Sequence, residues 1–188
     1  MTYQQALSML NCFPKKPTDD WDRHCINVGE IAYRIAQDLS RHITIDPEEV
    51  RLMGLVHDFG RSVTQCPYGH IYEGYKLFKK MGEDKLARIC ACHSNGTFRE
   101  ADLEGLGLEP QDFFVATLEE KLIFMADNLD CHGKTVRQSE RLGETIERYR
   151  KVDPTMLPIL EKKFSEFSQF DQEIQSITGK GVYQILGI

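Results

Sequence analysis

Histidine and aspartate side chains occupy core-facing positions in four predicted helices. Each lies about one helical turn from an apolar residue of the same helix, so it points toward the interior. These residues are His24, His57 with its neighbour Asp58, His93 and Asp127. A buried carboxylate without a compensating charge is costly, so Asp58 and Asp127 require a cationic partner. One metal centre would satisfy all of these side chains at once.

Each of these residues also has a simpler interpretation when it is taken alone. A histidine on an apolar face is usually a hydrogen-bonded core residue, and a buried aspartate is usually a helix cap or half of an ion pair. Their recurrence on four helices favours a shared metal site. Imidazole nitrogen and carboxylate oxygen without thiolate suit iron, manganese, nickel or zinc, and make a dedicated magnesium site less favourable.

The elements that would position these residues are helical. Apolar residues recur with a period of about 3.6 along the chain, and strand signals are nearly absent. We expect helices over 3–12, from Asp19 or Asp20 to Leu39, from Pro47 to Gly60, over 70–81, over 84–93, from Thr117 to Asp130, around 142–149 and after Pro154. Residues 94–110 contain three glycines and a proline, which predicts the longest loop.

This pattern predicts an all-α fold, a single compact bundle of about seven or eight helices over residues 1–188. The residues that could do chemistry lie within about 21–131. The helices expected over 135–188 would either cover the core or contact a second subunit, and in the second case the protein would be a homodimer.

The composition argues against several classes of protein. The 188 residues include 29 Asp and Glu against 23 Lys and Arg, and the net charge of −6 disfavours binding to long nucleic acid. No apolar run approaches the ~18 residues of a membrane-spanning helix, and the first residues do not resemble a signal peptide. The six cysteines form no CxxC pair. We therefore expect a cytoplasmic protein with reduced, packed thiols and no membrane partner.

The order of the candidate ligands resembles that of the HD-domain metal-dependent phosphohydrolases. That order is His24, then the doublet His57-Asp58, then Asp127 on a later helix. The segment Leu55-Val56-His57-Asp58-Phe59-Gly60-Arg61 resembles the family's HDIG motif followed by a basic residue, with Phe59 in place of a small aliphatic residue. The resemblance covers about residues 21–131. It implies an HD-type helical domain that hydrolyses phosphate esters or anhydrides.

Two further segments resemble the extra histidine motifs of the binuclear branches of that family, such as the bacterial symmetrical diadenosine-tetraphosphate hydrolases. They surround His70 and His93. By this resemblance, His24, His57, Asp58 and Asp127 would hold one divalent ion, and Asp58 would bridge to a second ion held by His70 and His93. Alternatively, His70 is an exposed residue at a helix start. His42 and His132 match no motif, so we predict that both lie at the surface.

The implied mechanism is attack on phosphorus by a hydroxide bound to the metal ions. Two ions about 3.5–4 Å apart can generate this nucleophile near neutral pH. Arg61 would be catalytic together with Asp58 and would bind the substrate phosphate, or else it is a solvated cation at a helix end. Asp130 would orient a ligand histidine, relay a proton, or face water.

The expected substrate is a small phosphorylated molecule, most simply a nucleotide. After His93 and after Asp127 the sequence departs from the diadenosine-tetraphosphate branch, so the resemblance does not identify the substrate. Two other functions stay open. The first is a mononuclear 5′-nucleotidase-type hydrolase, in which His70 and His93 would contact phosphate. The second is a non-catalytic module that senses a nucleotide.

Overall fold

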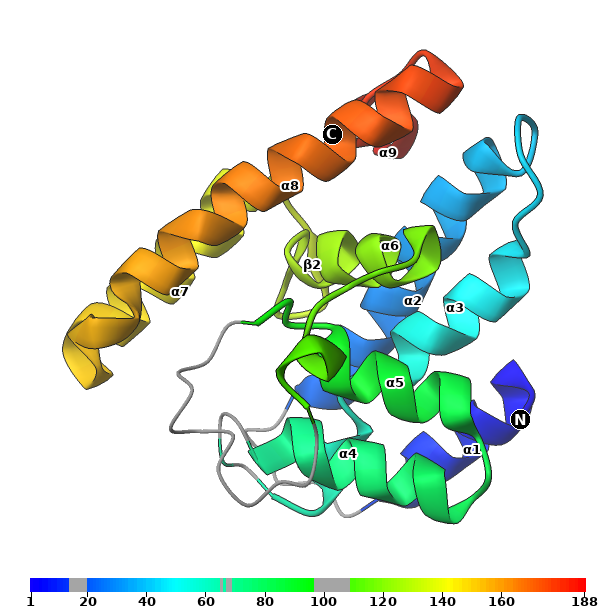
Figure 1. Cartoon of the computed structure of the whole chain (residues 1–188), viewed down its shortest axis with the longest axis vertical. Coiled ribbons are helices and arrows are strands. Elements are labelled where there is room, and N and C mark those ends of the chain that lie inside the picture. The colour runs from blue at the N-terminus through cyan, green and yellow to red at the C-terminus, as the bar shows by residue number, and fades with distance from the viewer. Residues whose placement is uncertain (14–19, 65, 67–68, 97–108) are drawn as a thin grey trace.

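The computed structural model describes residues 1–13, 20–64, 66, 69–96 and 109–188, and within them the fold is all-α (Figure 1). The α-helices are α1 (Tyr3–Cys12), α2 (Trp21–Leu39), α3 (Pro47–Val56), α4 (Gly69–Lys80), α5 (Asp84–Cys92), α6 (Leu118–Asp127), α7 (Gln138–Val152), α8 (Leu157–Thr178) and α9 (Val182–Leu186). Short 3₁₀ turns are η1 (Phe59–Ser62), η3 (Pro110–Phe113) and η4 (Pro154–Met156). Two-residue strands, β1 (Asp130–Cys131) and β2 (Lys134–Thr135), pair antiparallel.

Helix α2 is the centre of the core. Its apolar stripe is fully buried, and it packs against α3, α6 and α9 (Figure 1). The stripe consists of Cys25, Val28, Ile31, Ala32, Ile35, Ala36 and Leu39. Because His24 lies next to this stripe at the first turn of α2, the packing of α2 also places the first candidate ligand.

The predicted helix starts agree with the structure where they can be compared. The Asp46 carboxylate accepts a hydrogen bond from the Glu48 N–H at the start of α3, and Thr117 forms a capping box with Glu120 at the start of α6. Asp20 precedes α2 without a side-chain capping bond, while Asp19 lies outside the described residues. Most of the predicted loop at 94–110 also lies outside them, since residues 97–108 are not described.

Three details differ from the sequence prediction. The helix expected to run from Pro47 to Gly60 ends at Val56, and a 3₁₀ turn follows. The helix expected to reach Asp130 ends at Asp127, and the hairpin β1–β2 follows it. Nine α-helices are present in the described part of the chain rather than seven or eight, because Gly179, with φ 74°, separates the short α9 from α8.

The C-terminal helices contribute to two apolar clusters. Leu142 of α7 packs with Met156 and Leu160 in a small cluster of its own, whereas Phe167 and Ile174 of α8 are buried in the main core. Helices α7 and α8 therefore form a hairpin that is anchored to the core through the second half of α8 (Figure 1). None of the helices in the described ranges has the length and hydropathy required to cross a membrane.

The crossing of α2 and α3 depends on two glycines. A Cβ added at Gly54 would lie 2.7 Å from the Gly29 Cα, and one added at Gly29 would lie 3.0 Å from the Arg51 carbonyl oxygen. The two backbones are therefore in direct contact, which brings the C-terminal end of α3 against α2.

We predict that Gly54→Ala lowers the free energy of unfolding by about 1–3 kcal/mol, because the new methyl group must push α2 and α3 apart. Gly143→Ala is the matched control. Gly143 is exposed within α7 with nothing near its Cβ position, so this change should raise the free energy of unfolding by about 0.5–1 kcal/mol. Urea unfolding of the metal-free protein measures both. Equal effects of the two substitutions would contradict the close crossing.

Candidate metal centre

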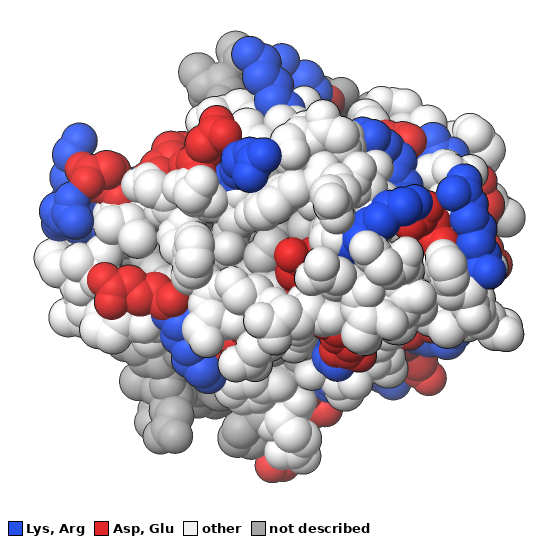
Figure 2. All heavy atoms as spheres, turned by 90° about the horizontal axis from the view of Figure 1, so that it is seen from above, with Lys and Arg blue, Asp and Glu red and all other residues white. Residues whose placement is uncertain are grey.

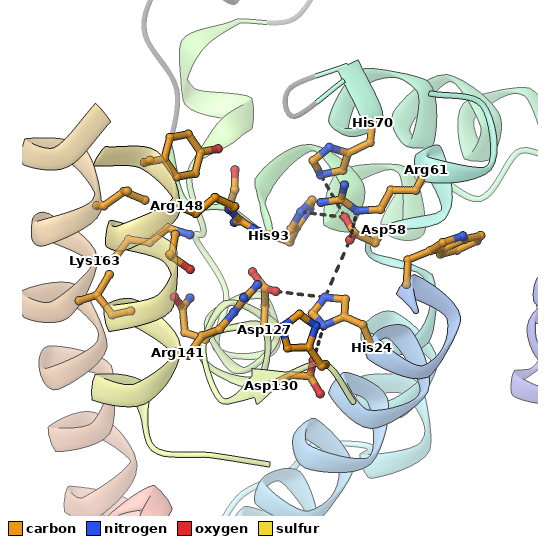
Figure 3. Close-up of a pocket in the computed structure, with 18 of the residues that line it drawn as sticks. His24, Asp58, Arg61, His70, His93, Asp127, Asp130, Arg141, Arg148 and Lys163 are labelled. Atoms are coloured by element: carbon orange, nitrogen blue, oxygen red, sulfur yellow. Dashed lines mark hydrogen bonds and ion pairs between the residues drawn. The ribbon is translucent and has the colours of Figure 1, made fainter. Parts of the chain in front are cut away.

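Four imidazoles and two carboxylates converge where α2, α3, α4, α5 and α6 meet. Figure 3 shows five of them, His24, Asp58, His70, His93 and Asp127. Around His24, the Nε2 atom lies 3.1 Å from His57 Nε2 and 3.2 Å from Asp127 Oδ1. His57 Nε2 lies 4.0 Å from the same Asp127 oxygen. These three ligand atoms are close enough to one another to hold a single ion.

Asp58 joins this group to a second one. Its Oδ1 atom lies 3.0 Å from His70 Nε2 and 3.6 Å from His93 Nε2, while its Oδ2 atom lies 3.8 Å from His24 Nε2 and 3.9 Å from His57 Nε2. The carboxylate thus stands between two pairs of histidines. The structure brings together all six side chains that the sequence proposes as metal ligands.

All four imidazoles turn the Nε2 atom toward the centre, because Nδ1 has an acceptor outside it. His57 Nδ1 is 2.7 Å from the Gly54 carbonyl oxygen, and His93 Nδ1 is 2.9 Å from that of Cys90. Nδ1 of His70 lies 3.4 Å from the Cys66 carbonyl oxygen and that of His24 lies 2.6 Å from Asp130 Oδ2. An Nδ1–H donated outward leaves the Nε2 lone pair free for a metal ion.

Helix ends produce this orientation for two of the histidines. His57 is the C-cap residue of α3 and His93 is the C-cap residue of α5. The last carbonyl groups of a helix have no intrahelical partner, so each imidazole can donate to the carbonyl three residues earlier. His70 approaches from α4 because Gly60 has no side chain: a Cβ there would lie 1.8 Å from the His70 carbonyl oxygen.

Asp58 is the most constrained charge of the site. Its Oδ2 accepts a hydrogen bond from Arg61 Nε, whereas its Oδ1 is buried and has no hydrogen-bond donor among the described residues, despite the two nearby imidazoles. Burial favours the neutral acid, but the charge of Arg61 opposes it, and the pKa of Asp58 is held well below its ordinary value. A buried anionic oxygen without a donor is suited to a cation.

The histidines differ in protonation. Burial lowers the pKa of His57 and lowers that of His93 to about 3, so both are neutral and ready to bind a metal. Burial acts in the same direction on His24, but its hydrogen bonds to Asp127 and Asp130 raise its pKa to about 10. In the metal-free protein, His24 therefore holds a proton where an ion would be held.

Asp130 orients His24. Its Oδ2 accepts from His24 Nδ1, and its Oδ1 accepts from the Asn27 amide at 2.5 Å. The Gly133 N–H, in the turn of the β1–β2 hairpin, donates to Oδ2 as well. Of the three roles that the sequence leaves open for Asp130, the contacts agree with the orientation of a ligand histidine.

The residues fit a centre for divalent metal ions. The donors are imidazole nitrogens and carboxylate oxygens, the combination typical of transition metals. Two observations are specific to this chain: the Asp58 oxygen that has no donor, and the proton on His24 between Asp127 and His57. Asp58 stands between the two pairs of histidines, so its carboxylate is near every candidate imidazole ligand.

A cavity of about 270 Å³ opens on the metal centre. One wall consists of the candidate ligands other than His57, together with Arg61, and the opposite wall consists of residues of α7 and α8 (Figure 3). Arg61 thus borders the cavity while its Nε holds Asp58. His42 is exposed, as predicted, and so is His132, although His132 lies at the cavity rim between Asp20 and Glu144.

Three cations of the opposite wall were not predicted from the sequence: Arg141, Arg148 and Lys163. A signal for Lys163 was present, because it lies three residues after Leu160 and four before Phe167, both of which are buried. It therefore interrupts an apolar stripe as His24 and Asp127 do. Asn27 was also missed, and no local pattern could find it, since its partner Asp130 is 103 residues away.

The chain is similar to several known proteins. Residues 21–131 match the HD domain family. Over 162 residues the chain is 33% identical to an uncharacterized protein of Methanocaldococcus jannaschii, a match that covers 85% of this chain and 94% of that protein. No solved structure matches the chain.

Two other relatives are named tRNA (cytidine(56)-2′-O)-methyltransferase. The protein from Picrophilus torridus is 27% identical over 175 residues, which are 93% of this chain and 48% of that protein. The protein from Thermoplasma volcanium is 28% identical over 129 residues, which are 68% of this chain and 36% of that protein. The chain thus spans about half or less of either methyltransferase.

Metal binding should release the His24 proton. Because the pKa of His24 is about 10, it is protonated at neutral pH, and a metal ligand must be neutral. The affinity for the first ion should rise about tenfold for each pH unit below that pKa and level off above it. Calorimetry in buffers of different ionisation enthalpy near pH 8 should find about one proton released per chain. Binding without proton release would contradict the protonation of His24.

Asp130→Asn should weaken metal binding about 10- to 100-fold, because the amide cannot hold the His24 ring as the carboxylate does. The helices should persist, since Asp130 follows α6 and no ligand is removed. Equilibrium dialysis with Mn²⁺ and circular dichroism measure the two quantities. An unchanged affinity would show that the contact between His24 and Asp130 has no part in metal binding.

Proposed function

Because the chain belongs to the HD-domain family, we propose that it is a metal-dependent phosphohydrolase with two divalent ions, acting on a nucleotide-like ester or anhydride. The observation that carries this proposal is the position of Asp58. Its buried carboxylate lies between two pairs of histidines whose Nε2 atoms all face it.

The residues would divide the work as follows. His24, His57 and Asp127 would hold one ion, His70 and His93 the other, and Asp58 would contact both. Such a pair of ions supplies, when bound, an activated water at neutral pH and charge stabilisation for the phosphoryl oxygens.

Arg61 has two tasks in this proposal. Its Nε holds Asp58 Oδ2, which fixes the carboxylate between the histidines. Its guanidinium also borders the cavity, where a planar cation suits a phosphate oxygen of the substrate. A planar group with several donors suits both tasks at the same time.

Two alternatives make different predictions. In a mononuclear nucleotidase, His70 and His93 would contact phosphate and would hold no metal ion. The buried Asp58 Oδ1 beside them would then have no cation to compensate its charge. In a nucleotide sensor the site would bind without turnover. The methyl transfer named for two relatives is not carried over, because the chain spans 48% and 36% of those proteins and the site argued above is a metal centre.

The experiment measures phosphate release from a panel of nucleotides by the protein loaded with Mn²⁺ or Fe²⁺, and metal content by elemental analysis. We expect turnover of at least one nucleotide and about two ions per chain. The Asp58→Asn variant should lose its metal, and its turnover should fall by more than roughly 100-fold. That is a larger loss than the roughly 10- to 100-fold expected when a residue that only orients a ligand is replaced.

Asp38→Asn is the matched control. Asp38 is also a buried aspartate, but it pairs with Arg41 and Lys180 at the far end of α2. The Asp38→Asn variant should therefore bind metal and hydrolyse nucleotides as the wild type does. One ion per chain would favour the mononuclear enzyme, and nucleotide binding without turnover by the loaded protein would favour the sensor.

A further inference from the structure

The cavity has a second charged wall. Helices α7 and α8 direct Arg141, Arg148 and Lys163 toward the metal centre across the cavity (Figure 3). These helices lie outside residues 21–131, the part of the chain that matches the HD domain. The cations therefore come from helices outside the part of the chain that matches the HD domain.

Lys163 is the most informative of the three. The residue is 9% exposed, and in the part of the chain that the structure describes no carboxylate lies within 4.0 Å of its ammonium group. The Nζ atom lies 5.6 Å from the Phe124 ring centroid, so its surroundings are partly apolar. A buried charge without an ion-pair partner destabilises the fold, which indicates that it is kept for a ligand.

The two arginines complete this wall. Arg148 and Arg141 are seven residues apart on α7 and so lie on the same face. Arg148 is exposed and has no ion pair with a carboxylate of the described residues, and its guanidinium lies 5.6 Å from the Tyr149 ring centroid. Arg141 has a carboxylate partner in Glu144, at 2.9 Å. Two of the three cations are therefore available to an anion in the cavity.

We propose that Lys163 and Arg148, assisted by Arg141, bind a second phosphate group of the substrate, so that the enzyme selects phosphoanhydride chains over simple monoesters. The inference rests on the proposed function, since the first phosphate is the one at the metal centre. The substrate class is then a nucleoside di- or triphosphate or a dinucleoside polyphosphate.

The surroundings favour a small anion over a long nucleic acid. The cavity volume of about 270 Å³ is slightly below the range of drug-sized ligand sites, so it accommodates a phosphate chain better than a polymer. On the face seen in Figure 2, basic side chains are separated by acidic and uncharged ones and do not form a continuous basic surface. A track for a nucleic-acid backbone requires such a surface.

The test compares two inert probes, methylenediphosphonate and orthophosphate, by calorimetry on the Mn²⁺-loaded protein with excess Mn²⁺. The wild type should bind the diphosphonate at least about tenfold more tightly than orthophosphate. Lys163→Met and Arg148→Met should each weaken diphosphonate binding roughly 10- to 100-fold, the scale of a lost hydrogen bond to a charged group. Orthophosphate binding should change less than about twofold, since the first phosphate needs only the metal ions and Arg61.

Lys162→Met is the matched control. Lys162 is exposed, pairs with Glu166 and does not line the cavity, so this variant should bind both probes as the wild type does. Equal affinity of the wild type for the two probes would overturn the proposal, and so would unchanged diphosphonate binding in the two cavity variants. Because the assay needs no turnover, its result is independent of whether a nucleotide is hydrolysed.

A stability measurement separates ligand binding from a structural role. If Lys163 serves a ligand, metal-free Lys163→Met should unfold at the same temperature as the wild type or a higher one, because a buried charge is replaced by an apolar side chain of similar length. A lower unfolding temperature would make Lys163 a structural residue and overturn its part in the proposal. Arg148→Met, at an exposed position, tests the binding without this complication.

Discussion

A single buried carboxylate determines how the rest of the site is arranged. Asp58 is 2% exposed, and a charge in that position must be compensated on both of its oxygens. Arg61 compensates one oxygen, and the imidazoles of His70 and His93 surround the other without donating to it. A metal ion would compensate the charge of Asp58 Oδ1 in place of a hydrogen-bond donor. The same ion would also bind the Nε2 atoms of the nearby histidines. The helices then have to bring these atoms to within a few ångströms of one point.

The fold achieves this with helix ends. His57 and His93 follow the last residues of α3 and α5, and Asp127 is the last residue of α6. The C-terminal end of a helix carries partial negative charge, so three such ends that meet at one place favour a cation there. The free carbonyl groups of the same ends fix two of the imidazole rings. Backbone and side chains therefore contribute to the same electrostatic environment, and the contact of Gly29 with Gly54 holds α3 in place.

The periodicity of buried residues predicted the helices and four of the candidate ligands, His24, His57, His93 and Asp127. Asp58 followed as the neighbour of His57, whereas His70 was proposed only from the resemblance to the HD-domain family. Features that depend on distant contacts or short elements were not predicted. The Asn27–Asp130 pair joins α2 to the β1–β2 hairpin, and two-residue strands have no periodicity to detect. Helix α3 ends at Val56, where no glycine or proline marks a helix end in the sequence. The residues that follow, Asp58 and Phe59, are buried, so this end depends on tertiary packing. Lys163 could have been found, since it interrupts an apolar stripe.

The two walls of the cavity serve different purposes. Residues 21–131, which match the HD domain, contain the candidate ligands, and α7 and α8 bring cations to face them. An ion at Asp127 would reduce the attraction of this carboxylate for Arg141 and Lys163, because its charge would be shared with the metal. Binding of metal would then leave the opposite wall with excess positive charge and increase its affinity for an anion. On the proposed function, the metal ions and a substrate phosphate on the opposite wall would therefore each strengthen the binding of the other.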